Sequence, residues 1–131
     1  MASIRKEVTV DASPEDVWKA LRDVGNAHRV FAGVLIDCRL EEDARIVTFA
    51  NGLVVRELIV DLDDTNRRFT WAAVGGRFRH YNSSLQVFAE TGGSARVVWI
   101  SDLLPHDLAG EVAALMDQGA ATMKRTLARS R

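Results

Sequence analysis

The stretch from Val34 to Leu104 alternates apolar and polar residues in six runs, with short turn-forming segments between them. Val8 and Val10 alternate in the same way near the N-terminus. Because short turns can join only antiparallel neighbours, the pattern predicts an antiparallel meander rather than parallel crossovers. The runs, in order, are VLIDCRLEED, ARIVTFANG, LVVRELIVDLDD, RRFTWAAV, RHYNSSLQVFAE and SARVVWISDLL.

The spacing of apolar residues changes from two to three or four in two places, which predicts helices there. After the first strand, Ser13 precedes Pro14 and Asp16 follows, an arrangement typical of a helix N-terminus. A further turn of helix is expected over residues 26–31. Near the C-terminus, one apolar stripe predicts a long helix from about Asp107 to Arg129, with Asp107 as its N-cap.

Together these elements predict an α+β fold, in which a seven-stranded antiparallel sheet curves around the C-terminal helix and two short helices follow the first strand. The length of 131 residues suits one domain with its own core, so residues 1–131 are assigned to a single domain. Gly119 lies in the middle of the helical stripe and leaves two interpretations open. Either the helix faces an internal void, or the missing side chain lets the helix approach the sheet closely.

Polar residues fall on both faces of the run RHYNSSLQVFAE, which is unusual for a strand with one face in a dry core. Buried polar groups need hydrogen-bond partners, and an apolar pocket with a few convergent polar groups is typical of a small-molecule site. We therefore expect the strand faces that carry these polar groups to line an internal cavity. The residues expected on these faces are Val55, Glu57, Ile59, Phe69, Trp71, Arg79, Tyr81, Ser83, Leu85, Ile100 and Asp102.

Composition and charge argue against several other classes of protein. The net charge is -1 and the basic residues form no stripe, so no nucleic-acid partner is expected. The single cysteine, Cys38, fits a reducing compartment, and no apolar run has the length needed for membrane insertion. The sequence contains no metal-ligand, phosphate-binding or dinucleotide-binding motif. We expect a soluble cytoplasmic protein without a metal or a cofactor.

The segments SPEDVWKAL and VRELIVDLDDTNRRFTWAAVGGRFRHYNSSLQVF, followed by the C-terminal helix, resemble the helix-grip superfamily of birch pollen allergens, START domains and polyketide cyclases/dehydrases. Within it, the chain is most similar to the branch that contains the abscisic-acid receptors. The resemblance implies a cavity between sheet and helix, lined by Glu57, Trp71, Tyr81 and Ser83. It adds Leu115, Gly119 and Met123 from the helix, and two entrance loops: Asn51, Gly52 and Leu53 in one, and Gly75, Gly76, Arg77 and Phe78 in the other.

The sequence departs from the receptors where they carry a lysine that pairs with a carboxylate, because this position is expected to be Ile36. No buried cation would then face Glu57, so abscisic acid itself is not the expected ligand. We expect the chain, as a monomer or weak homodimer, to bind or carry a small hydrophobic molecule such as a lipid, polyketide or isoprenoid. One alternative is a cyclase or dehydratase that uses Glu57 as its acid or base. Another is a protein-interaction or co-chaperone-like module.

Overall fold

The computed structural model of the chain describes residues 2–129 and confirms the predicted order of strands and helices. Two short helices and one long helix accompany seven strands. The elements are β1 (Ala2–Val10), α1 (Pro14–Arg22), η1 (Val24–Asn26), α2 (Ala27–Val30), β2 (Leu35–Glu41), β3 (Ala44–Phe49), β4 (Val54–Asp63), β5 (Arg68–Val74), β6 (His80–Ala89), η2 (Thr91–Gly93), β7 (Ala95–Leu104), η3 (His106–Leu108) and α3 (Ala109–Leu127).

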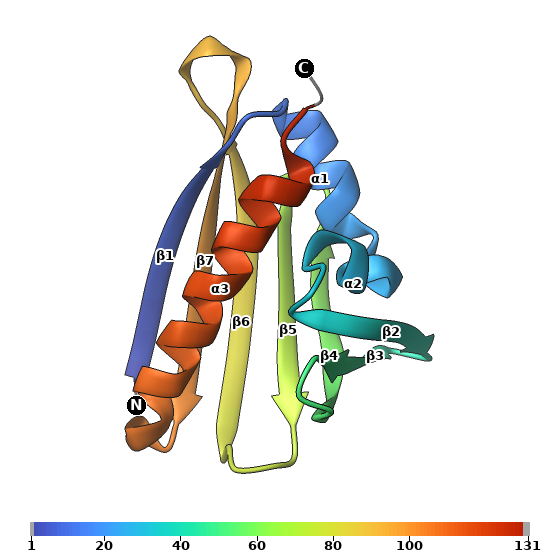
Figure 1. The fold of residues 1–131 in the computed structure, drawn as a ribbon, viewed down its shortest axis with the longest axis vertical. Helices are drawn as coiled ribbons and strands as arrows, with labels where there is room; N and C mark the ends of the chain where they lie inside the picture. The colour runs from blue at the N-terminus through green and yellow to red at the C-terminus, as the bar shows by residue number, and fades with distance from the viewer. Residues whose placement is uncertain (1, 130–131) are drawn as a thin grey trace.

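The strands form a single antiparallel sheet in the order β1-β7-β6-β5-β4-β3-β2. Strands β2 to β7 follow one another as a meander, and β1 closes the sheet beside β7. Helix α3 lies across one face of the sheet (Figure 1). Helix α1 contacts β6 and β7, and α2 contacts β2 and α3. The sheet therefore wraps around α3, as the alternation of the strands and the stripe of the helix predicted.

The sequence predicted the first residue of α1 correctly but not that of α3. Helix α1 begins as expected, because Ser13 Oγ accepts a hydrogen bond of 3.1 Å from the Asp16 backbone N–H. Helix α3 begins later than expected, at Ala109, and Leu108 occupies the N-cap position. The prediction that Asp107 caps this helix is wrong, since Asp107 lies within the preceding 3₁₀ turn.

Gly119 brings α3 close to the inner face of the sheet. A Cβ atom at this position would lie 2.8 Å from the Trp99 ring atoms Cζ3 and Cη2, and 3.5 Å from Phe31 Cε1. Of the two interpretations of Gly119, the second is therefore correct: the missing side chain lets α3 approach the sheet closely at Trp99. The other buried residues of α3 are Val112, Met116, Thr122 and Met123.

Substitution of the two glycines in α3 should have opposite effects on stability. Gly119→Ala should lower the free energy of unfolding by up to about 2 kcal/mol, because a displaced Trp99 costs more than the gain in helix propensity. Gly110→Ala should raise it by about 0.5 to 1 kcal/mol, because nothing lies within 4 Å of its added Cβ. Urea denaturation of both variants measures the difference. A stabilised Gly119→Ala variant would contradict the close approach.

Candidate functional site

A buried ion pair joins β3 and β4 on the inner face of the sheet. Arg45 and Glu57 lie opposite each other in the strand register, so their side chains share one face. Arg45 Nε donates a hydrogen bond of 2.8 Å to Glu57 Oε1, and the two side chains are only 6% and 11% exposed. The prediction that no buried cation faces Glu57 is therefore wrong.

Other groups hold the Arg45 guanidinium in place. Its Nη1 donates a hydrogen bond of 3.2 Å to the backbone carbonyl of Val24. Its central carbon lies 5.0 Å from the centre of the Phe69 ring and 5.3 Å from that of Trp71, which is the range of cation–π contacts. A carboxylate, a carbonyl and two aromatic rings therefore surround the guanidinium and offset part of its desolvation.

The ion pair forms one wall of an inner pocket with a cavity volume of about 50 Å³. The pocket is lined by the loop after α2, by strands β2, β3, β4, β5 and β7, and by helix α3. Among its lining residues, Glu57, Trp71, Leu115 and Gly119 were predicted from the sequence. Arg45 and Glu57 supply the charges, and the other residues are Phe31, Val34, Leu35 and Trp99, all apolar apart from the indole N–H groups.

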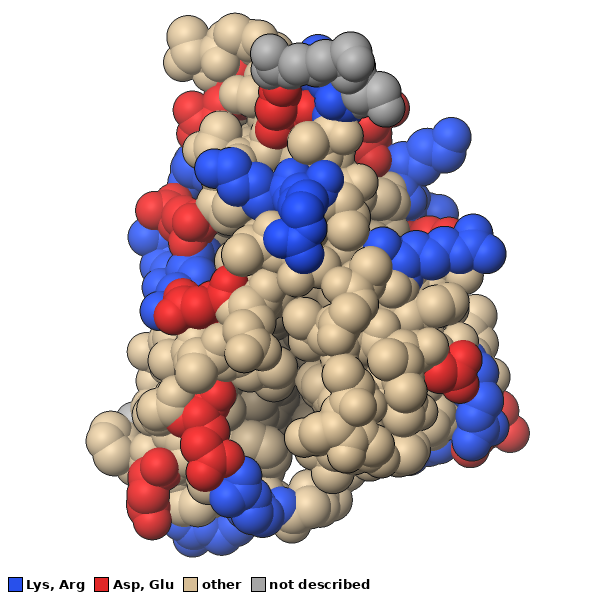
Figure 2. Space-filling view, in the orientation of Figure 1, with Lys and Arg blue, Asp and Glu red and all other residues tan. Residues whose placement is uncertain are grey.

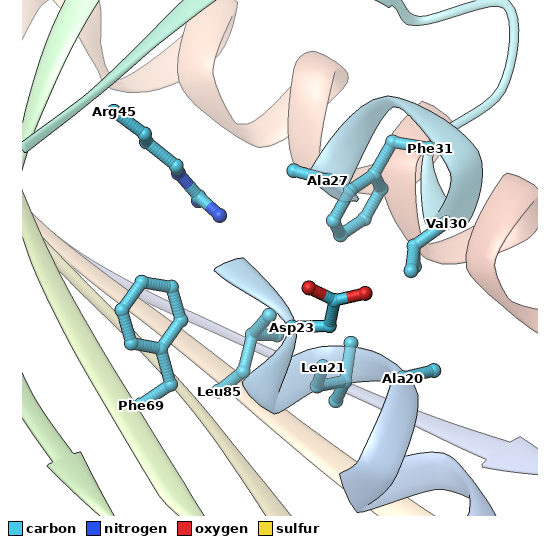
Figure 3. A pocket seen from close by; sticks show the side chains of 9 residues that line it. All are labelled: Ala20, Leu21, Asp23, Ala27, Val30, Phe31, Arg45, Phe69 and Leu85. Carbon is cyan, nitrogen blue, oxygen red and sulfur yellow. The ribbon is translucent and has the colours of Figure 1, made fainter. Parts of the chain in front are cut away.

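A second, smaller pocket lies on the other side of Arg45. It has a volume of about 10 Å³, close to the minimum for one water molecule, and includes the predicted residues Phe69 and Leu85. Figure 3 shows the Arg45 guanidinium and the Phe69 ring on one side of this pocket, with the Asp23 carboxylate and the Phe31 ring on the other. The guanidinium therefore separates two small spaces in the interior.

The predicted entrance loops meet at one end of the sheet. A cleft of about 170 Å³ lies between Leu53 and Val55 on one side and Gly75, Arg77 and Phe78 on the other. We call this space the mouth cleft; its remaining lining residues are Val54, Ala73, Val74 and Gly76. Leu53, Val54 and Val74 are large apolar residues that remain exposed there. The mouth cleft is therefore an accessible apolar space beside the inner pocket.

A neighbouring groove of about 190 Å³ runs along α3. Asn51 lines it together with Gly33, Val34, Phe49, Ala50, Leu115 and Gln118. Val34 and Leu115 line both this groove and the inner pocket. Gly52 follows Asn51, which lines this groove, and precedes Leu53, which lines the mouth cleft. Its backbone has a positive φ of 92°. The space-filling view shows a hollow beside the lower half of α3, surrounded mostly by uncharged side chains (Figure 2).

An ion pair fastens the second entrance loop to α3. The Arg77 guanidinium donates hydrogen bonds to the carboxylate of Glu111 in the first turn of the helix. The hydrogen bonds from the Arg77 guanidinium lower the pKa of the Glu111 carboxyl. Both side chains are exposed, so the pair orients the loop but adds little stability.

Tyr81 and Ser83 point to the inner face, as predicted, but they interact with protein groups instead of lining the inner pocket. The hydroxyls of Ser83 and Ser101 lie 2.6 Å apart in a hydrogen bond, and both residues are buried. Phe78 covers Tyr81, with ring centres 4.8 Å apart in an edge-on contact. Burial raises the pKa of Tyr81, and the Ser83 and Ser101 hydroxyls lower it in part. This polar cluster satisfies itself within the core.

Two more predicted residues belong to the core around these spaces. Met123 is fully buried, and Ile59 is partly buried and packs against the same hydrophobic cluster. Neither lines the inner pocket or the mouth cleft. They belong to the hydrophobic core instead.

Four predicted cavity residues lie elsewhere, and their placement in the sequence analysis is wrong. A bulge between Leu35 and Asp37 turns Leu35 inward and leaves Ile36 59% exposed. Arg79 precedes β6 and is exposed. Ile100 and Asp102 lie opposite Ser84 and Asn82, and therefore on the outer face, while Ser101 opposite Ser83 takes the inner position.

The architecture and the pocket between sheet and helix define the helix-grip fold. Residues 1–130 match the family described as polyketide cyclase/dehydrase and lipid transport, and the chain belongs to this family. No curated protein matches the chain in sequence.

Three solved structures share the fold at low sequence identity. An uncharacterised protein from Bacillus thuringiensis has a TM-score of 0.86 and 17% identity, covering 96% of this chain and 98% of its own. The protein XoxI from Bacillus cereus has a TM-score of 0.85 and 20% identity, covering 97% and 96%. A truncated norcoclaurine synthase from Thalictrum flavum has a TM-score of 0.68 and 18% identity, covering 91% of each chain. At these identities the likeness concerns the fold alone.

Within residues 2–129, no group of three or more histidine, cysteine or acidic side chains is placed to hold a metal ion. None of the helices described is both long and apolar enough to span a bilayer.

Removing one member of the buried ion pair should cost more than removing both. Arg45→Met should lower the free energy of unfolding by about 3 to 5 kcal/mol, because it leaves the Glu57 carboxylate buried without its partner. The double variant Arg45→Met, Glu57→Met should recover most of this loss. Arg39→Met, which removes an exposed partner of Glu41, should change stability by less than about 1 kcal/mol. Equal losses in the single and double variants, measured by chemical denaturation, would contradict the pairing.

Tyr81 should make the protein less stable in alkaline solution. Burial raises its pKa above the ordinary value of about 10, so above this pH the unfolded chain releases the phenol proton before the folded chain does. The stabilising contribution is complete below about pH 10 and is lost as the pH rises through the folded pKa. Because the chain has one tyrosine, its phenolate absorbance reports this titration directly.

Tyr81→Phe should remove this part of the alkaline loss. The comparison between wild type and variant isolates Tyr81 from Cys38, whose pKa burial also raises. A native titration that coincides with that of the urea-unfolded chain would show that the phenol is not buried.

Proposed function

We propose that this chain binds and carries a small hydrophobic ligand that has one polar end. The polar end lies against Arg45 and Glu57 in the inner pocket, and the apolar body extends into the mouth cleft between the two entrance loops. The observation that carries this proposal is a buried ion pair that lines an otherwise apolar inner pocket, with an accessible apolar cleft bordered by the same strands, β4 and β5.

The strand geometry supports a continuous path between the two spaces. Val55 lines the mouth cleft and Glu57 the inner pocket, two positions further along the same face of β4. Ala73 and Trp71 have the same relation on β5. Two residues of a strand span about 7 Å, so one elongated molecule can contact both spaces.

The sizes of the spaces favour an elongated ligand over a compact one. The inner pocket, at about 50 Å³, has room for a polar end group but not for a lipid or polyketide body. Sites for such molecules usually measure about 300 to 1,000 Å³, so the ligand must use the mouth cleft or the neighbouring groove as well. The description of the family, which includes lipid transport, supports this class of ligand.

Native mass spectrometry of freshly purified protein should detect a co-purified small molecule. For a carrier, this molecule should be recovered unchanged after long incubation with fresh protein. Chemical conversion that Glu57→Gln abolishes would instead favour the cyclase or dehydratase alternative, in which Glu57 transfers a proton.

The mouth cleft can be tested with two neighbouring alanines on β5. Ala73→Leu should fill part of the cleft and weaken binding of the uncharged dye Nile red by roughly tenfold or more. Ala72→Leu is the matched control, because Ala72 points to the opposite face of the strand and lines none of these spaces. Fluorescence titration measures both affinities. Equal binding by the two variants would contradict entry through this cleft.

A further inference from the structure

We propose that Glu57 sets the ligand selectivity of the inner pocket. By neutralising Arg45, it makes the pocket favour an uncharged ligand that ends in a hydroxyl or carbonyl group, and it excludes a carboxylate. This inference rests on the proposed binding function and names the chemical class of the polar end.

The charges around Arg45 leave no unpaired positive charge for an acid. Glu57 binds the guanidinium at 2.8 Å on the side of the inner pocket. On the other side, the Asp23 carboxylate faces the same smaller pocket as the guanidinium (Figure 3). The remaining residues of the inner pocket are uncharged. An acidic ligand would therefore lose its hydration and lie beside a carboxylate, without a free cation in return.

The hydrogen-bonding groups of the pocket suit a hydroxyl or carbonyl oxygen. An arginine carries five N–H donors, and among the described residues this guanidinium donates from Nε to Glu57 and from Nη1 to Val24. Glu57 accepts that bond through Oε1, which leaves Oε2 as an acceptor. A ligand hydroxyl can donate to Oε2 and accept from the guanidinium, whereas a carboxylate can only accept.

Removing the charge of Glu57 should reverse the selectivity. In Glu57→Gln the shape of the pocket is nearly unchanged, but Arg45 becomes a buried cation without its carboxylate partner. A ligand carboxylate can then act as the anionic partner of Arg45 and accept charge-assisted hydrogen bonds from the guanidinium. In Arg45→Met the unpaired group is the Glu57 carboxylate, which should select an ammonium instead.

The experiment compares 1-decanol, decanoate and decylamine, which share one alkyl chain, at neutral pH. Trp71 and Trp99 line the pocket, so tryptophan fluorescence reports occupancy. Wild type should bind decanol at least roughly tenfold more tightly than decanoate or decylamine. Glu57→Gln should prefer decanoate by a similar factor, and Arg45→Met should prefer decylamine. Glu7→Gln, a surface glutamate paired with Arg5 and Arg96, should behave as wild type.

The outcomes separate this inference from the proposed function. If wild type binds decanoate as tightly as decanol, or if Glu57→Gln keeps the wild-type order, Glu57 does not set the selectivity, although the binding function stands. If none of the probes binds any of the proteins, both proposals fail. If a variant is too unstable to titrate, thermal unfolding gives the same order, because the preferred probe raises the melting temperature most. An unchanged order of thermal shifts in Glu57→Gln would also overturn the inference.

Discussion

The buried ion pair between Arg45 and Glu57 constrains the whole inner face of this sheet. Two charges in an apolar interior are stable only when each is paired and its geometry is fixed. Strand register supplies the pairing, the Val24 carbonyl anchors the far end of the guanidinium, and the Phe69 and Trp71 rings cover it. Arg45 and Glu57 also border the inner pocket, so they place two charged groups in a lining that is otherwise apolar.

The aromatic residues around the pair explain why the inner pocket is small. Phe31, Trp99, Trp71 and Phe69 form a chain of ring contacts, with centres 5.6, 6.3 and 5.1 Å apart along it. Gly119 allows this chain to reach α3, since any side chain there would meet the Trp99 ring. Sheet and helix are thus held together by rings in the middle of the molecule, and the larger open spaces lie at the end where the entrance loops meet.

The sequence predicted the strands and helices well because alternation and helical stripes depend on local spacing. It failed where a position depends on another strand. In β7, Val97, Val98, Trp99 and Ile100 are consecutive apolar residues, so alternation does not identify the inner face, and Ile100 and Asp102 were assigned to it wrongly. Ile36 was misplaced because nothing in the sequence indicates the bulge beside Leu35.

Arg45 was missed for a related reason. It follows Glu41, Glu42 and Asp43, and a charged residue after such a run is usually at a solvated turn. Arg45 shares a face with Val47 and Phe49, which is the local signal for an inward position. Only the pairing of β3 with β4 places Glu57 opposite it.

Two of the buried polar clusters among residues 2–129 differ in their position relative to the inner pocket. Ser83 and Ser101 satisfy each other across β6 and β7, and Phe78 covers the neighbouring Tyr81, so this cluster stabilises the sheet without facing the inner pocket. Arg45 and Glu57 face the pocket and keep donor and acceptor capacity beyond their mutual bond. Both clusters would look alike in a list of buried polar residues. The difference lies in whether the hydrogen-bonding groups are used up within the protein, and this determines where a bound molecule can add an interaction.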